Sequence, residues 1–395
     1  MNILYHHRTR ATDAQGIHIF EIAQAMRELG HSVEMASLTA GHGAPAASVE
    51  QAGPSRLREM LRVSELIQLG YNLAGIPYLL WKIYRGSIDL IYERYSLFNF
   101  SGVIAAKLSR RPLILEVNSP LALEESRQRI SGRIPLAYWS ERVICNMATK
   151  VVVVSSPLRR MLVASGVQDD KLLVISNGVN PKAFLGGAES ERLRAALGLT
   201  GKTVIGFVGW FKTWHRVDLL IAAFDDRKLA ESGAALLLVG DGPAMPQLLA
   251  LTQKRNLGAS VKFSGAIPHR EIPMYVDLFD IAVQPAANEY CCPMKILEYM
   301  ALGKAIVAPR QENVQELLRA DEARFFARGD AVQLGAALSE LVDDAGSRRE
   351  IAKRGQRAVQ DRGFLWSRNA ERVLASVSVP DRGEKQLTVT GNHPN

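Results

Sequence analysis

A short stretch rich in basic residues gives the first sign of chemistry in the sequence. Lys212, His215 and Arg216 follow the apolar run Val204–Val208 and precede a helical pattern, Leu219–Phe224. If the run is a strand of an open α/β sheet, this loop lies at the carboxyl edge, where ligands of such sheets bind. Three donors at that edge suit a diphosphate, and the alternative is a solvated basic turn.

A second pattern places a lysine and a glutamate one helical turn apart. Pro293 suits the start of a helix, and Lys295 and Glu298 are three residues apart, so both are predicted on one helix face. In a functional interpretation the lysine binds phosphate and the carboxylate accepts both hydroxyls of a ribose. The alternative is an ion pair within the helix.

Glycine-containing loops follow several of the apolar runs. Gly16 ends the stretch Asp13–Gly16, Gly209 opens the basic loop, and Asp241 lies in the turn Gly240–Pro243. Glycine lets the backbone approach an anion, and the free N–H groups of a following helix favour negative charge. The alternatives are an ordinary helix start and an ordinary turn, because Gly, Asp and Pro are good turn formers.

Several common catalytic patterns are missing from the sequence. It has no G-x-G-x-x-G fingerprint, no P-loop and no G-x-S-x-G elbow. It also has no Asp-x-Asp pair and no His/Cys cluster with metal-ligand spacing. We therefore expect no metal and no bound cofactor, and basic side chains with helix N-termini would neutralise a leaving diphosphate.

The elements that would position these residues fall into two sets of short, apolar, β-branched runs. Helix-period stretches separate most of them, and the runs lack polar alternation, which is typical of strands buried on both faces. The sequence therefore predicts two doubly wound α/β domains. The predicted strands are 2–6, 33–37, 90–92, 113–117, 151–154 and 172–175, then 204–208, 235–239, 261–263, 281–284 and 305–308.

Length and composition agree with two soluble globular domains. The 395 residues exceed what one core usually serves, and 47% apolar with 22% charged residues excludes disordered and collagen-like classes. Three cysteines cannot form a disulfide framework, so we expect a cytoplasmic protein. The net charge of +8 favours anionic partners: a nucleotide diphosphate, an acidic membrane or nucleic acid. Nucleic acid is disfavoured because zinc spacing, RNA-binding signatures and long basic runs are absent.

Taken in order, these pieces resemble the family 4 glycosyltransferases, retaining enzymes of the GT-B fold that use nucleotide-sugar donors. Together with Trp366 near the end, the matching segments cover nearly the whole chain. The segments are Gly30–Val33, Val174–Phe184, Phe207–Lys212, Val239–Pro243 and Pro293–Lys304.

The resemblance implies the domain boundaries and a donor site. It implies an acceptor-binding domain at 1–180, a nucleotide-sugar domain at 181–362 and a closing helix at 363–379 packed on the first domain. Residues 380–395 are polar and lack periodicity, so we expect a disordered tail there. Gly16 would meet the donor phosphates, Lys212–Arg216 would add cationic contacts, Glu298 would bind the ribose, and Ile267 would hold the base. The implied donor-binding set is Gly16, Gly209, Lys212, His215, Arg216, Asp241, Ile267, Lys295 and Glu298.

Three positions depart from the family pattern. Trp210 stands where the family usually has an arginine, so Lys212 would take over that role. Tyr290 stands where a sugar-facing glutamate is expected, with Glu289 one place off. Asn118 replaces a first-domain histidine, and we predict that it lies at the cleft floor near the donor sugar. The candidate catalytic residues are Lys212, Lys295, Asn118 and Glu289.

The implied reaction is transfer of a hexosyl group, with retention, to a glycan, a glycolipid or a small molecule, as in polysaccharide biosynthesis. Two alternatives stay open: a nucleotide-sugar epimerase of the same fold, and a non-catalytic anion-binding protein with a degenerate cleft. The stretch Leu61–Arg85 combines apolar and basic residues, which predicts peripheral attachment to an anionic membrane. Its alternative is a pair of core-facing helices around Gly75–Pro77.

Overall fold

Two parallel sheets, each with six strands, organise the part of the chain that the computed structural model describes, residues 1–9, 14–38, 63–127, 134–181 and 188–378. The first sheet has the order β2-β1-β3-β4-β5-β6 and the second β12-β11-β10-β7-β8-β9. The first set of strands is β1 (Asn2–His6), β2 (Ser32–Ala36), β3 (Leu90–Arg94), β4 (Leu113–Val117), β5 (Lys150–Val153) and β6 (Leu172–Val174). The second set is β7 (Thr203–Val208), β8 (Ala234–Val239), β9 (Val261–Phe263), β10 (Ile281–Val283), β11 (Ala305–Pro309) and β12 (Arg324–Phe326).

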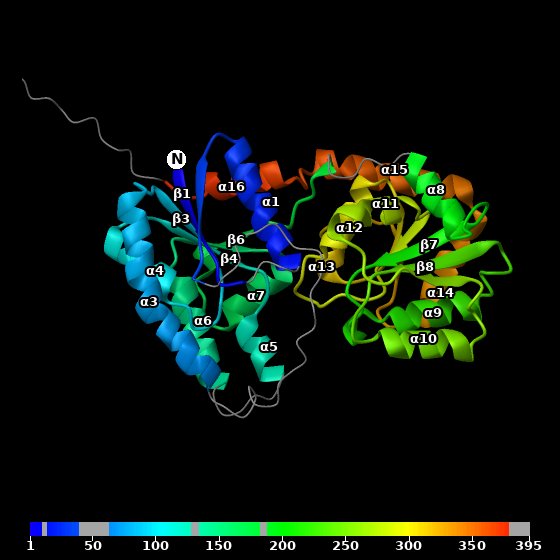
Figure 1. Ribbon diagram of the computed structural model, residues 1–395, viewed down its shortest axis with the longest axis horizontal. Coiled ribbons are helices and arrows are strands. Elements are labelled where there is room, and N and C mark those ends of the chain that lie inside the picture. The colour runs from blue at the N-terminus through cyan, green and yellow to red at the C-terminus, as the bar shows by residue number, and fades with distance from the viewer. Residues whose placement is uncertain (10–13, 39–62, 128–133, 182–187, 379–395) are drawn as a thin grey trace, which may run out of the picture.

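Helices alternate with these strands, as parallel pairing requires. Figure 1 shows them around two lobes, one for each sheet. The helices of the first lobe are α1 (Ala14–Glu28), α3 (Val63–Arg85), α4 (Ser101–Ser109), α5 (Leu121–Arg127), α6 (Ile134–Met147) and α7 (Ser156–Ala164). Those that follow are α8 (Ala188–Ala196), α9 (Val217–Asp226), α10 (Met245–Lys254), α11 (Ile272–Asp277), α12 (Met294–Ala301), α13 (Glu312–Gln315), α14 (Ala331–Asp343), α15 (Ala345–Asp361) and α16 (Trp366–Ala375).

Each sheet has a switch point, where the order of its strands reverses. In the first sheet it lies between β1 and β3, and in the second between β7 and β10. Loops leave the two strands of a switch point in opposite directions, which opens a crevice at the carboxyl ends of the strands. The fold therefore offers two places for ligands, and the candidate site residues lie at both.

The last helix returns to the first domain. Trp366, Ala370 and Val373 of α16 are buried in one apolar cluster with Ile19 and Ile22 of α1. Figure 1 shows α16, in red, beside α1. Burial of this apolar face against α1 joins the end of the chain to the first sheet.

The structure corrects several expectations about the elements. β12 was not predicted, because Arg324–Phe326 is short and begins with a charge. Gly16 lies in the first turn of α1, not in the loop before it. The segment whose alternative interpretation was a pair of helices forms a single helix, α3, with Pro77 inside it. The tail expected at 380–395 lies outside the described residues.

Candidate functional site

The loops after β7 and β8 are locked together through glycines. The Phe211 amide donates to the carbonyl of Asp241 at 2.7 Å, and the Ala244 amide donates to the carbonyl of Phe211 at 2.9 Å. A Cβ on Gly240 would lie 2.1 Å from the carbonyl oxygen of Gly209, with φ of Gly240 at +124°. Only glycine permits this approach, so these loops form a close-packed backbone wall at the second switch point.

Lys295 brings an ammonium group to this wall. Its Nζ lies 4.2 Å from the centre of the Phe207 ring, and a Cβ on Gly209 would lie 2.7 Å from the same Nζ. The Nζ is buried and has no hydrogen-bond partner among the described residues. Burial lowers the pKa of Lys295 to about 8, and Glu298 opposes that shift. The second switch point therefore holds a desolvated cation without a hydrogen-bond partner among the described residues, which is uncommon for a buried charged group.

Glu298 lies one turn further along α12. Burial raises the pKa of its carboxyl to about 7, although nearby Lys295 acts in the other direction. Because Lys295 Nζ has no hydrogen-bond partner, the two side chains do not form the ion pair that was the alternative interpretation of their spacing. Both groups lie on the same helix and are separately available to a ligand.

The basic loop contains fewer free cations than its sequence suggests. The Nδ1 of His215 donates to the carbonyl of Trp210 at 2.6 Å, and burial lowers the pKa of His215 to about 2, with Lys295 and Lys212 adding to the effect. His215 is therefore a neutral ring. Arg216 adopts the left-handed conformation before α9 and pairs with Asp218 at 3.1 Å. Lys212 is exposed, and the expected cationic cluster of this loop reduces to that side chain.

The remaining residues of the implied donor site lie after β8 and β9. An Oδ1 of Asp241 accepts from the Gly242 amide at 2.6 Å, which shapes the turn. Ile267 is half-buried and packs against the apolar core. Gly240 and Gly265 form an isolated bridge, so the two loops meet. Asp241 thus has a turn-forming role in the structure, and the base contact of Ile267 stays a prediction.

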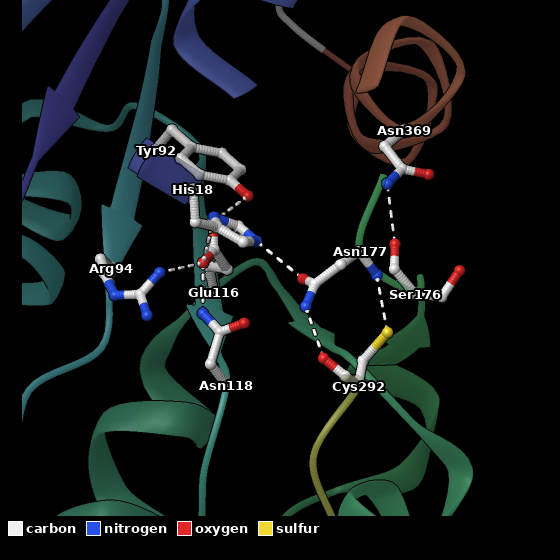
Figure 2. A network of polar contacts seen from close by, with 9 residues as sticks. All are labelled: His18, Tyr92, Arg94, Glu116, Asn118, Ser176, Asn177, Cys292 and Asn369. Atoms are coloured by element: carbon white, nitrogen blue, oxygen red, sulfur yellow. Dashed lines mark hydrogen bonds and ion pairs between the residues drawn. The ribbon is translucent and has the colours of Figure 1, made fainter. Parts of the chain in front are cut away.

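Glu116, at the end of β4, is the centre of the polar network in Figure 2. It accepts from Arg94 Nη1 at 2.8 Å, from the Tyr92 hydroxyl at 2.7 Å and from the amide of Asn118. The Nδ1 of His18 lies 3.3 Å from its Oε1. Burial acts to raise the pKa of Glu116, but His18 and Arg94 outweigh it and hold the pKa below its ordinary value. Glu116 is therefore a buried carboxylate that Arg94 and several hydrogen-bond donors keep in its charged form.

Asn118 lies on the wall of a cavity at the first switch point. The cavity has a volume of about 520 Å³ and opens at the carboxyl ends of β1, β3 and β4. Its lining is formed by Arg8, Thr9, Arg94, Tyr95, Ser96, Leu97, Glu116, Asn118, Ser119, Leu121 and Glu124. The side-chain amide of Asn118 donates to Glu116, so its orientation is fixed. Its proximity to a donor sugar stays a prediction.

A second set of contacts in Figure 2 joins the two domains through Asn177. Its Oδ1 lies 2.9 Å from His18 Nε2, and its Nδ2 donates to the carbonyl of Cys292 at 2.9 Å. Asn369 of α16 donates to the neighbouring carbonyl of Ser176 at 2.7 Å. These contacts could not be predicted from the sequence, because a short polar residue before glycine gives no information about partners more than a hundred residues away.

Tyr290 and Glu289 both contact the first domain. The Tyr290 hydroxyl donates to Glu124 at 2.5 Å, and Glu289 pairs with Arg127 at 2.8 Å on the surface. The residue at the position of the family's sugar-facing glutamate thus reaches the rim of the first-domain cavity, since Glu124 lines it. A catalytic role of Glu289 stays a prediction, and the structure places its carboxylate in this surface ion pair.

Two kinds of feature are absent from the described residues, 1–9, 14–38, 63–127, 134–181 and 188–378. No group of three or more His, Cys, Asp or Glu side chains converges in a way that would hold a metal ion. None of the helices in these ranges combines the length and the apolar character needed to traverse a bilayer.

Two parallel sheets with a crevice at each switch point, and a last helix that returns to the first sheet, define the GT-B class of fold. The chain matches the family model Glycosyltransferase Family 4 over residues 15–183 and the model Glycosyl transferases group 1 over residues 202–344. It therefore belongs to the family 4 glycosyltransferases, which are enzymes. The fold class and the family predicted from the sequence are confirmed.

Curated relatives are distant. The alpha-D-kanosaminyltransferase of Streptomyces kanamyceticus is 24% identical, over 61% of this chain and 64% of its own length. The 2-deoxystreptamine glucosyltransferase of the same organism is 26% identical, over 62% and 65%. The chain thus spans just under two thirds of these two relatives. A 2-deoxystreptamine N-acetyl-D-glucosaminyltransferase from Streptomyces fradiae is 25% identical, over 86% of this chain and 85% of its own length.

Solved structures share the fold over nearly the whole chain. Anabaena HepE, crystallised with UDP-glucose, has a TM-score of 0.70 at 20% identity and covers 95% of this chain and 100% of its own. The sucrose-phosphate synthase of Thermosynechococcus elongatus has a TM-score of 0.72 at 21% identity, over 95% and 98%. At these identities the likeness concerns the fold alone.

Proposed function

We propose that the protein transfers a hexosyl group, with retention and without a metal ion, from a nucleoside-diphosphate sugar to a glycan, a glycolipid or a small-molecule acceptor. The nucleotide binds at the second switch point and the acceptor at the first. The observation that supports this most strongly is the buried, unpartnered ammonium of Lys295 beside Gly209. A diphosphate would supply the bonds that this group lacks.

In this proposal the second domain stabilises the leaving group. As the bond to the sugar breaks, negative charge builds on the diphosphate, and Lys295 would stabilise that charge. Because it is desolvated, its attraction to the diphosphate is stronger than that of an exposed lysine. Lys212, exposed in the adjacent loop, would add to it, and Glu298 would accept the two ribose hydroxyls.

The comparisons support a nucleotide-sugar donor without identifying it. The curated relatives include transferases of amino sugars and glucose, and HepE was crystallised with UDP-glucose. The nucleotide is UDP or GDP in this proposal. Both bases are uncharged, and Ile267 and its neighbours would contact either one through backbone groups.

The first experiment is thermal unfolding with UDP, GDP and ADP, since a ligand that binds only the native state raises the melting temperature. The preferred nucleotide then selects the sugar nucleotides to test for release of nucleoside diphosphate, with and without EDTA. A transferase releases the diphosphate and gives a product whose anomeric configuration, measured by NMR, matches the donor. Isomerised sugar would indicate the epimerase, and binding without any turnover would indicate the non-catalytic protein. Loss of activity in EDTA would contradict the metal-independent mechanism.

We also propose that the protein acts in the cytoplasm, at an anionic membrane surface, through the outer face of α3. Leu73, Trp81 and Tyr84 are exposed there, and the Arg85 guanidinium lies 5.1 Å from the centre of the Trp81 ring. Aromatic rings beside basic groups suit the interface of an anionic bilayer. The segment also serves the core, because Leu79 is fully buried, and the side chains of 63–69 lie outside the description.

A further inference from the structure

Among the described residues that line the cavity at the first switch point, Arg8 is a cation that forms no ion pair with a carboxylate. Arg94 pairs with Glu116 at 2.8 Å, and Glu124 accepts from the Tyr290 hydroxyl. Arg8, also in the cavity wall, forms no ion pair with any described residue. Its guanidinium instead lies 4.2 Å from the centre of the Tyr71 ring. Of the two arginines in the described lining, Arg8 is therefore the one whose guanidinium is not paired with a carboxylate.

A buried relay holds Arg8 in place. Glu93 Oε2 lies 2.8 Å from His6 Nδ1, and both residues are fully buried. A carboxylate only accepts, so His6 Nδ1 donates to it, and His6 Nε2 lies 3.0 Å from the Tyr71 hydroxyl. The Tyr71 ring then supports the guanidinium of Arg8. The chain of contacts runs from the interior to the cavity and ends at a cation.

The sequence makes room for this relay. A Cβ on Gly102 would lie only 1.4 Å from Glu93 Oε2, so the carboxylate fits because residue 102 is glycine. The other oxygen of Glu93 accepts from the Asn99 amide at 3.2 Å. Burial of a glutamate lowers the stability of the fold unless its oxygens are hydrogen-bonded in this way. Through His6, the buried Glu93 fixes the Tyr71 ring that lies against Arg8.

We propose that Arg8 binds an anionic group, a carboxylate or a phosphate, on the acceptor. The planar guanidinium presents paired donors that match both oxyanions, and stacking on Tyr71 fixes the plane from which they project. The inference rests on the proposed function, because the second switch point is assigned to the nucleotide and the first to the acceptor. Arg8 is then a specificity residue that selects acidic acceptors over neutral ones.

The test compares three sugars of one size on the full chain by ligand-observed NMR titration: glucose 6-phosphate, glucuronate and glucose. The protein is saturated with the nucleotide that stabilises it, so that phosphate cannot occupy the donor site. The variants are Arg8→Gln, which removes the charge, Arg8→Lys, which keeps the charge without the fork, and Tyr71→Leu, which removes the stacking ring. Lys107→Gln is the matched control, because it removes an exposed positive charge from α4 of the same domain.

We expect the wild-type protein to bind at least one acidic sugar about tenfold or more tighter than glucose, as for a hydrogen bond to a charged group. Preference for glucose 6-phosphate alone assigns a phosphorylated acceptor, preference for glucuronate alone a uronate, and equal preference either oxyanion. Arg8→Gln should abolish the preference, Arg8→Lys and Tyr71→Leu should reduce it, and Lys107→Gln should retain it. Far-UV circular dichroism and melting temperatures verify that each variant is folded.

Three results would overturn the inference. They are equal binding of all three sugars by the wild-type protein, an unchanged preference in Arg8→Gln, or a weakened nucleotide affinity in Arg8→Gln, which would assign Arg8 to the donor. Failure of every nucleotide to bind is a different result, because it contradicts the proposed function. In that case glucuronate and glucose are compared without nucleotide, and their difference still decides whether Arg8 binds an anion.

Discussion

The switch points of the two sheets differ in the sign of their buried charge and in whether that charge has hydrogen-bond partners. At the second, Lys295 is a buried ammonium with no hydrogen-bond partner among the described residues. At the first, Glu116 is a buried carboxylate with donors from Arg94, Tyr92 and Asn118 around it. A group that is left unsatisfied costs stability until a ligand arrives, whereas a satisfied network stabilises the empty site. The buried cation of the second switch point is therefore left without a partner among the described residues, whereas the buried carboxylate of the first is held by its own neighbours.

The largest effect is expected when the ammonium group of Lys295, which has no hydrogen-bond partner among the described residues, is removed. Lys295→Met should lower turnover by about 100-fold or more, the loss typical of one preorganised donor to a developing anion. It should also raise the melting temperature of the ligand-free protein, because an apolar side chain replaces a desolvated charge. Steady-state kinetics and calorimetry measure the two effects.

The matched control for this prediction is Lys304→Met. Lys304 is also largely buried, but its Nζ pairs with Asp277 at 3.3 Å. Removing it leaves that carboxylate without its partner, so the melting temperature should fall. If Lys295→Met also lowered the melting temperature, Lys295 would be a structural residue and the contrast between the two switch points would fail.

The next effect concerns the carboxylate of the donor site. Glu298→Gln should weaken nucleoside-diphosphate binding about tenfold or more, because a charged acceptor contributes about 1.5 to 3 kcal/mol to a hydrogen bond. Lys212→Ala should instead lower turnover more than affinity, since its interaction grows as charge builds on the leaving group. Unchanged nucleotide affinity in folded Glu298→Gln, measured by calorimetry, would show that the ribose binds elsewhere.

The pKa values of Glu298 and Lys295 predict a narrow pH optimum for sugar-nucleotide binding. Glu298, with its pKa raised to about 7, loses its charge as the pH falls through that value. Lys295, with its pKa lowered to about 8, loses its proton as the pH rises. Affinity should be greatest between these values and fall about tenfold per pH unit on either side. In Glu298→Gln the acidic limb should disappear while the basic limb persists, and titrations at several pH values test this. An acidic limb that persists in the variant would assign it to another group.

The contrast also explains what could be predicted from the sequence. The strands could be predicted because buried parallel strands are uninterrupted apolar runs. The placement of Lys295 and Glu298 on one helix face could be predicted because it depends only on their spacing within α12. The network around Glu116 could not be predicted, because Arg94 and His18 come from distant parts of the chain. His215 was interpreted as a cation because the sequence does not show its burial, which makes the ring neutral. Arg8 was missed because its signal, Tyr71 beneath it, lies on a different element.

A smaller effect is expected at Asn118. Asn118→Ala removes one donor of Glu116 and leaves Arg94 and Tyr92 in place, so the fold should persist. If the amide faces the donor sugar, turnover should fall by about tenfold, the value of an ordinary hydrogen bond, while nucleotide affinity changes less. Turnover equal to that of the wild-type protein would remove Asn118 from the catalytic group.

The smallest expected effect concerns membrane binding, which should depend on the outer face of the first domain and not on that of the second. Each basic residue near an anionic membrane contributes about 1 kcal/mol, so Arg85→Gln should weaken binding to phosphatidylserine vesicles about fivefold. Lys82 should matter less, because it already pairs with Glu34, and Lys353→Gln, an exposed position on α15 of the second domain, should have no effect. Vesicle sedimentation with rising phosphatidylserine content measures all three. Attachment through α3 requires binding that increases with lipid charge, decreases most in Arg85→Gln and is unchanged in Lys353→Gln. Binding that ignores lipid charge, or that falls equally in Lys353→Gln, would mean that the exposed Trp81 and Tyr84 do not mark a membrane surface.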